Sequence, residues 1–311
     1  MSSNPNIPHE LFGYKVIDRL GEGAASVVYA VADPKTKQVL ALKHVIKRGD
    51  KDQRFIDQLE QEYKIGSKLS HPNIRAIHRY ATNKKGWVGD VTDAALVMEL
   101  IDSATLDSEH RPKAAQIARY FAQAARGLGH MHQRGFVHAD MKPSNMMVND
   151  DGAVKVIDLG QACPVGTKKV RVQGTPGYIA PEQAFKEAIT PSTDIYNLGA
   201  TLHWVLVRSE IPCALPSGEA SVERRIRPSQ IRMPRPLHEV DPRIPAAFTD
   251  VVFACVQVAP KDRAESMDTV AAKLDSIAET CERKGLGADL EGKVGGGTSP
   301  DRRCDSDISH D

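Results

Sequence analysis

One stretch near the middle of the chain, residues 138–160, restricts what this sequence can fold into more than any other. It opens with His-Ala-Asp-Met-Lys-Pro-Ser-Asn at 138–145, and two short apolar segments follow on either side of a turn at 149–152. It closes with Asp-Leu-Gly at 158–160. A loop followed by two apolar runs around an Asn/Asp/Gly turn predicts a β-hairpin with an acidic residue at the end of its second strand.

The polar residues of this stretch suit phosphoryl transfer from a metal-bound nucleotide. Asp140 can orient a hydroxyl group and take its proton, and Lys142 can offset charge on the transferred phosphoryl group. The amide oxygen of Asn145 and the carboxylate of Asp158 are hard oxygen ligands that suit Mg²⁺. A polar surface loop before a hairpin is the plainer alternative, because Asp and Asn are common in loops.

Taken together, the two motifs, thirteen residues apart from Asn145 to Asp158, resemble the catalytic and metal-binding segments of the eukaryotic-type (Hanks-type) protein kinases. The stretch departs from that family at two positions. Ala139 stands where arginine is usual, and Leu159 stands where phenylalanine is usual. The resemblance implies the roles given above for the four polar residues, and ATP with Mg²⁺, or Mn²⁺ in its place, as cofactors.

A glycine-rich segment near the N-terminus, Gly-Glu-Gly-Ala-Ala-Ser at 21–26, lies between strand-like runs at 14–17 and 27–29. Backbone N–H groups of such a hairpin can approach phosphate oxygens closely, because no side chain stands in the way. The kinase pattern is GxGxxGxV, and Ser26 replaces its third glycine. An ordinary hairpin turn is the alternative, and a Walker A loop is excluded because no Gly-Lys-Ser/Thr follows. The resemblance implies nucleotide contacts from Leu20, Gly21, Glu22, Gly23, Ser26 and Val28.

Two charged residues of the N-terminal third are expected to form an ion pair. Lys43, in the alternating run 39–45, matches the lysine that holds the α- and β-phosphates in protein kinases. Apolar periodicity predicts a helix at about 52–69. The resemblance implies that Glu62 on this helix pairs with Lys43, and Glu60 is the rival. Four residues after Glu62, where the family places a bulky apolar side chain, stands Gly66. We therefore expect an empty place there and a loosened helix, with Ile65 or a neighbour filling the gap as the alternative.

The nucleotide base is expected at the end of an apolar strand, 94–98, where the chain passes through a hinge at 99–101. By resemblance, Met98 lies at the back of the pocket and the hinge backbone reads adenine. A buried strand-end methionine with no ligand is the alternative for Met98. The remaining nucleotide contacts that the resemblance implies are Ala41, Met98, Glu99, Ile101 and Met147.

Residues 158–182 resemble the activation segment of the family and end in Gly-Thr-Pro-Gly-Tyr-Ile-Ala-Pro-Glu, which matches the closing motif GTxxYxAPE. The resemblance places Thr175 in the catalytic machinery, with its hydroxyl bonded to Asp140 and Lys142. A Gly/Pro-rich loop without a role is the alternative.

Two structural roles also follow from the resemblance. Asp194 is expected to hold the backbone of the catalytic loop. Arg263 is expected to pair with Glu182.

Composition sets broad limits on the class of protein. A chain of 311 residues has the length of about two domains or lobes, and 41% apolar with 26% charged residues is typical of a globular protein with a sizeable core. The net charge of +1 gives no support for nucleic-acid binding. Five scattered cysteines without CxxC spacing suggest free thiols in a reducing compartment. The first ten residues lack an apolar secretory core, and the apolar run 195–207 is too short and polar for a transmembrane segment, so we expect a cytoplasmic protein.

The expected architecture is an α+β, two-lobed protein-kinase-like fold over residues 11–283. An antiparallel sheet with one helix forms the N-lobe at 11–98, and a mainly helical C-lobe spans 102–283. Residues 1–10 are expected to be a flexible lead and 284–311 a disordered tail. The arginines of 224–235 are expected on a solvated face, with a docking patch for acidic or phosphorylated partners as the alternative.

The expected function is that of a serine/threonine protein kinase, which transfers the γ-phosphoryl group of Mg-ATP to Ser or Thr hydroxyls of protein substrates and autophosphorylates. Serine and threonine are favoured over tyrosine because Lys142 and Thr175 are typical of Ser/Thr members. A pseudokinase scaffold and a small-molecule kinase of the same fold stay open as alternatives. The oligomeric state is not predicted.

Overall fold

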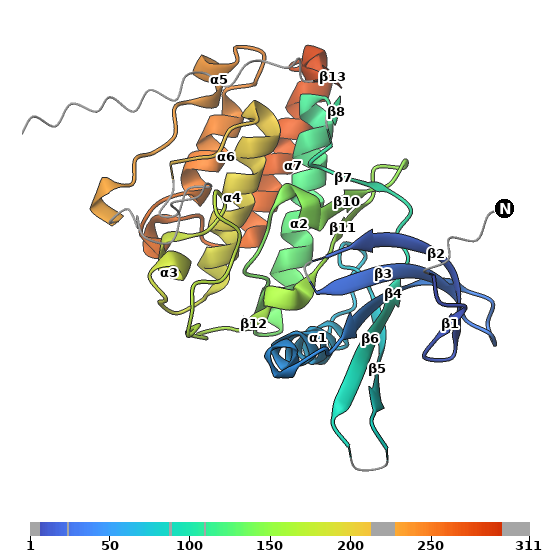
Figure 1. Ribbon diagram of the computed structural model, residues 1–311. Helices are drawn as coiled ribbons and strands as arrows, with labels where there is room; N and C mark the ends of the chain where they lie inside the picture. The colour runs from blue at the N-terminus through green and yellow to red at the C-terminus, as the bar shows by residue number, and fades with distance from the viewer. Residues whose placement is uncertain (1–6, 24, 87–88, 109, 213–227, 294–311) are drawn as a thin grey trace, which may run out of the picture.

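In a computed structural model, which describes residues 7–23, 25–86, 89–108, 110–212 and 228–293, a curled sheet and a bundle of helices form two lobes (Figure 1). The N-terminal sheet is wholly antiparallel, with the strand order β1-β2-β3-β4-β6-β5. Its strands are β1 (Glu10–Leu11), β2 (Tyr14–Glu22), β3 (Ser26–Ala32), β4 (Val39–Ile46), β5 (Ile77–Lys84) and β6 (Val91–Glu99).

Helix α1 (Gln53–Gly66) covers one face of this sheet. Its buried residues Ile56 and Leu59 pack against Val45 of β4 and Leu96 of β6. Alternate strand residues point to opposite faces of a sheet, so Lys43 lies on the same face as Val45, toward α1 and the second lobe. The helix ends at Gly66, three residues earlier than its apolar periodicity predicts.

The two long helices α2 and α7 pack side by side in the C-lobe and run antiparallel. Helices α4 and α6 pack beside them (Figure 1). Its core includes Phe121 of α2, Tyr196 of α4 and Phe248 of α6, all fully buried. The helices are α2 (Ala114–Gln133), α3 (Pro181–Ala184), α4 (Pro191–Val207), α5 (Leu237–Val240), α6 (Ala247–Cys255) and α7 (Met267–Lys284). Among the described residues, no helix has the length and apolar character needed to cross a membrane.

Short strands carry the segments that the sequence marks as functional. The predicted hairpin is present, and its strands pair in a small sheet of order β11-β10-β7. The short elements are β7 (Ala104–Thr105), β8 (His110–Arg111), β9 (Phe136–Val137), β10 (Met146–Val148), β11 (Val154–Val156), β12 (Cys163–Pro164), β13 (Gly292–Lys293), and the 3₁₀ helices η1 (Asp50–Asp52), η2 (Pro143–Asn145), η3 (Leu159–Gln161), η4 (Pro228–Gln230), η5 (Pro260–Asp262) and η6 (Ala288–Leu290).

The expectation of disorder is wrong for 284–293. After α7, Gly285 takes a left-handed conformation, Leu290 is buried, and β13 pairs with β8. The Nε of Arg111 donates to the carbonyl oxygen of Leu290 at 3.0 Å. Leu290, Arg111 and the pairing of β13 with β8 thus help to hold a stretch whose glycines and charges suggest a tail.

The N-terminal lead is also shorter than expected. The N–H of Val16 donates to the carbonyl oxygen of His9, and β1 starts at Glu10. Residues 1–6 and 294–311, and three of the arginines of 224–235 (Arg224, Arg225, Arg227), lie outside the described part of the chain.

Candidate active site

A line of three charged residues joins the two lobes. The Nζ of Lys43 lies 2.9 Å from the Oε2 of Glu62 and 3.3 Å from the Oδ1 of Asp158. Burial alone would lower the pKa of Lys43, but the two carboxylates overcome this and raise it above its ordinary value. The Lys43 charge in turn lowers the pKa of Asp158. The rival Glu60 instead pairs with Lys64 on the exposed side of α1, so the expected partner of Lys43 is confirmed.

The expected empty place at Gly66 is wrong. A Cβ built on Gly66 would overlap the Cδ1 of Ile77 and lie 2.9 Å from its Cγ1. The first residue of β5 therefore fills the space that a side chain on α1 would occupy. The ion pair of Lys43 with Glu62 is formed in the presence of this glycine, so Gly66 does not displace the helix.

Three polar groups meet at the catalytic loop. The hydroxyl of Thr175 donates to the Oδ1 of Asp140 at 2.7 Å and accepts from the Nζ of Lys142 at 3.0 Å. The same Nζ lies 3.2 Å from the Oδ2 of Asp140. These contacts, which tie the activation segment to the loop, confirm the bonds expected for Thr175. They fix the direction in which the Asp140 carboxylate points.

The loop backbone is held from beneath by helix α4. Asp194, in the first turn of α4, accepts from the N–H groups of His138 and Ala139 at 2.9 and 2.8 Å, and its Oδ2 lies 2.8 Å from the Nε2 of His132. This confirms the expected role of Asp194. The Nε2 of Gln183 donates to the carbonyl oxygen of Ala139, so a second side chain fixes the same turn.

An apolar contact stands where the family usually has an arginine. Ala139 has a φ of 61° and is 2% exposed, in a cluster with Val137, Cys163 and Ile189. The start of the activation segment is thus joined to the catalytic loop by packing, and the pairing of β9 with β12 adds backbone hydrogen bonds.

The end of the activation segment is fixed by a buried ion pair. Arg263 donates to the two carboxylate oxygens of Glu182 at 2.7 and 2.8 Å, as expected. Thr193 also donates to Glu182, at 2.9 Å. The segment that carries Thr175 is therefore anchored just after it by groups withdrawn from solvent.

A cavity of about 940 Å³ lies between the lobes, within the size range of small-molecule sites. It brings together predicted residues from the glycine-rich hairpin, β4, α1, β6 and the segment 140–158. Those that line it are Gly21, Glu22, Gly23, Ser26, Val28, Lys43, Glu62, Met98, Asp140, Lys142, Asn145 and Asp158.

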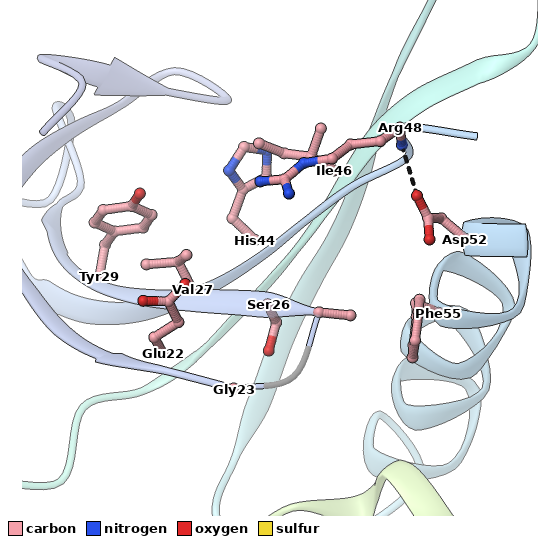
Figure 2. Close-up of a pocket in the computed structure, with 11 residues that line it drawn as sticks. Glu22, Gly23, Ser26, Val27, Tyr29, His44, Ile46, Arg48, Asp52 and Phe55 are labelled. Atoms are coloured by element: carbon pink, nitrogen blue, oxygen red, sulfur yellow. Dashed lines mark hydrogen bonds between the residues drawn. The ribbon is translucent and has the colours of Figure 1, made fainter. Parts of the chain in front are cut away.

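The glycine-rich hairpin separates this cavity from a smaller hollow on the other face of β3 and β4, shown in Figure 2. Val28 and Lys43 line the large cavity, whereas their neighbours Val27 and His44 line the hollow. The hairpin is closed by the N–H of Gly23, which donates to the carbonyl oxygen of Ser26 at 2.7 Å. A tight backbone turn thus forms the wall between the two.

Five predicted nucleotide contacts do not line the cavity. Leu20 is half exposed, and Ala41 is enclosed within the sheet opposite Met98. The Glu99 side chain turns to Lys155, 2.8 Å away, and to the N–H of Ala76. The other two are Ile101 and Met147. The ion pair with Lys155 decides the orientation of the Glu99 side chain, which motif position does not reveal.

The donor set at the inner end of the cavity fits a hard divalent cation. The amide nitrogen of Asn145 donates to the carbonyl oxygen of Asp140 at 2.8 Å, which leaves its oxygen as the group for a metal. Asp158 has a φ of 62°, an uncommon value for a residue other than glycine, and its carboxylate lines the same cavity. Carboxylate and amide oxygens are the ligands that Mg²⁺ prefers.

Several residues of the cavity wall were not singled out by sequence reasoning, and Arg75 is the charged one among them. Its guanidinium lies beside the sulfur atoms of Met98 and Met147. The signal available in the sequence is a single charge between Ile74 and Ala76 at the start of a strand-like run.

Comparison with known proteins agrees with this geometry. The family model described as the protein kinase domain matches residues 14–274, so the chain belongs to the protein kinase family. It is 25% identical over 272 residues to a probable serine/threonine-protein kinase of Clostridium acetobutylicum, covering 85% of this chain and 40% of that protein. It is 31% identical over 206 residues to the serine/threonine-protein kinase PknA of Mycobacterium tuberculosis, covering 63% and 47%.

A third relative, the serine/threonine-protein kinase PknL of M. tuberculosis, is 28% identical over 275 residues, covering 86% of this chain and 66% of PknL. The chain thus spans less than half the length of the first two relatives. The two-lobed kinase fold expected from the sequence is confirmed.

Proposed function

We propose that this chain is a serine/threonine protein kinase that transfers the γ-phosphoryl group of Mg-ATP to Ser or Thr hydroxyls of protein substrates. The observation that carries the proposal is one cavity lined by both the Lys43–Glu62–Asp158 ion pairs and the carboxylate of Asp140. The named relatives support the Ser/Thr class.

Each residue has a task in this proposal. Asp140, oriented by Thr175, accepts the proton of the substrate hydroxyl, and Lys142 offsets charge on the transferred group. Lys43, held by Glu62, binds phosphate oxygens. Asn145 and Asp158 would hold Mg²⁺ or Mn²⁺, which supplies neutralising charge at the phosphates. The glycine-rich hairpin covers the phosphates with its backbone N–H groups.

The proposed unit is residues 11–283, with the hinge at 99–101. A cytoplasmic location is part of the same proposal, supported by the buried free thiols of Cys163, Cys255 and Cys281. The proposed partners are protein substrates that carry Ser or Thr. Binding of nucleic acid is not part of the proposal.

The test is transfer of radiolabelled phosphate from ATP to a protein substrate and to the chain itself. Asp158→Ala and Lys43→Met should each lose about 10²-fold or more in rate, because each removes a charge-stabilising contact to the transition state. Asp151→Ala in the exposed turn and Lys64→Met on the outer face of α1 are the matched controls. Near-normal transfer by a folded Asp158→Ala protein would refute the assignment.

The same assay separates the alternatives. A pseudokinase scaffold would bind ATP yet transfer no more phosphate than Asp140→Asn. A small-molecule kinase would hydrolyse or transfer phosphate without labelling any protein.

A further inference from the structure

Arg75 places a cation in the wall of the cavity, beside the side chains of Met98 and Met147. It follows the bridge between Ile74 and Val156, and its N–H donates to the carbonyl oxygen of Val156 at 3.0 Å. Backbone contacts thus fix where its side chain starts. The guanidinium then reaches Met98 at the end of β6 and Met147 of β10.

The guanidinium has donors without adequate acceptors. Its Nη1 and Nη2 lie 3.7 Å and 3.3 Å from the sulfur atoms of Met98 and Met147. Its Nε is buried and has no hydrogen-bond partner among the described residues. Thioether sulfur is a weak acceptor, and a buried donor left without a partner costs free energy. The arginine also forms no ion pair with a carboxylate in the described part of the chain.

The described residues around Arg75 leave its guanidinium charged but do not supply acceptors for all of its N–H groups. Burial lowers the pKa of Arg75, whereas the more distant carboxylates of Glu62, Glu99 and Asp158 raise it. Arginine remains protonated in such surroundings. The wall of the cavity therefore presents a planar, two-pronged hydrogen-bond donor that needs an acceptor from whatever enters.

The edge of a nucleotide base supplies such acceptors. Guanine presents two adjacent acceptors, N7 and O6, and the arginine fork matches them. Adenine presents N7 beside an amino group, which is a donor and cannot pair with a second donor. The same fork thus distinguishes the two purines.

We infer that Arg75 reads the base of the bound nucleotide, and that it shifts selectivity toward a purine with a carbonyl group at position 6, so that GTP competes with ATP for this cavity. The inference rests on the proposed nucleotide site and adds a specificity residue to it. Arg75 acts on the base alone and takes no part in the transfer step.

Calorimetric titration of the full chain with Mg-ATP and with Mg-GTP tests this. In Arg75→Met, the ratio of the GTP dissociation constant to the ATP dissociation constant should rise about tenfold over wild type, as expected for loss of one two-pronged contact. Arg79→Met is the matched control, because Arg79 is exposed on β5 and lies over the ring of Tyr14. Its ratio should equal that of wild type.

Arg75→Lys gives a second measurement that keeps the charge but removes the fork, and its ratio should lie between wild type and Arg75→Met. An unchanged ratio in both Arg75 variants would overturn the inference. The ratio would also be unchanged if the dissociation constants of both nucleotides fell equally. That result would mean that Arg75 only occupies the space of the base. A folded wild type that binds neither nucleotide would overturn the proposed function itself.

Discussion

Arg263 and Arg75 are both withdrawn from solvent to a large extent, and their surroundings differ. Arg263 donates to both oxygens of Glu182 and to three backbone carbonyl groups, and it lies 4.9 Å from the ring centre of Tyr196. Arg75 contacts two sulfur atoms and leaves its Nε without a partner among the described residues. Both side chains carry one positive charge. They differ in the groups that accept their hydrogen bonds, which are oxygens for Arg263 and sulfurs for Arg75.

The difference separates a structural charge from one available to a ligand. Buried polar groups are nearly always hydrogen-bonded, and a buried charge is tolerated when its partners are complete. Arg263 has complete partners at the end of the activation segment. Arg75 lacks them at the wall of a cavity. The end of the activation segment is thus fixed by complete hydrogen bonds, whereas the cavity wall at Arg75 keeps a donor that the described residues leave unsatisfied.

Removing the structural arginine should have the largest effect on stability. Arg263→Met leaves Glu182 buried without a cation, and we expect a loss of about 3–5 kcal/mol in the free energy of unfolding. Urea denaturation followed by circular dichroism measures it. Arg243→Met, at an exposed pair with Asp241, is the control and should cost less than about 1 kcal/mol. A comparable small loss for both variants would break the comparison.

The catalytic loop should respond to the loss of a single hydroxyl. Thr175→Ala frees the Asp140 carboxylate to turn, and misplacement of a reacting group by about 1 Å can cost 10²-fold in rate. Thr175→Ser keeps the hydroxyl and should largely keep the rate of protein phosphorylation. Thr167→Ala, which removes a hydroxyl that donates to the carbonyl oxygen of Pro164, should change this rate little. Equal rates for the Ala and Ser variants of Thr175 would show that its hydroxyl does not orient Asp140.

Overfilling the N-lobe should have a moderate effect. Gly66→Leu forces its side chain into the place of Ile77, and we expect a loss of about 1–3 kcal/mol together with lower activity. Combining it with Ile77→Ala should restore part of that stability, because the two side chains compete for one space. Thermal unfolding of the two single variants and the double variant tests this, and simple additivity would contradict it.

The smallest expected effect has the opposite sign. Without nucleotide, Arg75→Met replaces a buried cation by an apolar side chain between two methionines, and we expect a gain of about 1 kcal/mol. Thermal unfolding with and without nucleotide measures it. A loss of stability as large as that of Arg263→Met would mean that the two arginines are both structural.

Motif order allowed the fold and the reacting groups to be predicted from the sequence. Asp140 and Asn145 lie just before the β10–β11 hairpin and Asp158 just after it, so their proximity follows from local structure. Lys43 and Glu62 required the resemblance, because they lie on different elements.

What stayed beyond the sequence depends on packing between distant segments. The contact of Gly66 with Ile77 joins a helix end to a strand eleven residues later. The orientation of the Glu99 side chain depends on its ion pair with Lys155. Whether the Nε of Arg75 has a hydrogen-bond partner depends on side chains that are distant in the sequence. No periodicity or motif records such relations.

The apolar cluster around Ala139 has a consequence for the ionic strength at which this protein works. At physiological salt, attraction between exposed charges that lie more than about 8 Å apart is largely screened. Apolar packing is not screened by salt. The junction of catalytic loop and activation segment relies on Val137, Cys163 and Ile189 at this point. Its order should therefore be the same in dilute buffer and in molar salt.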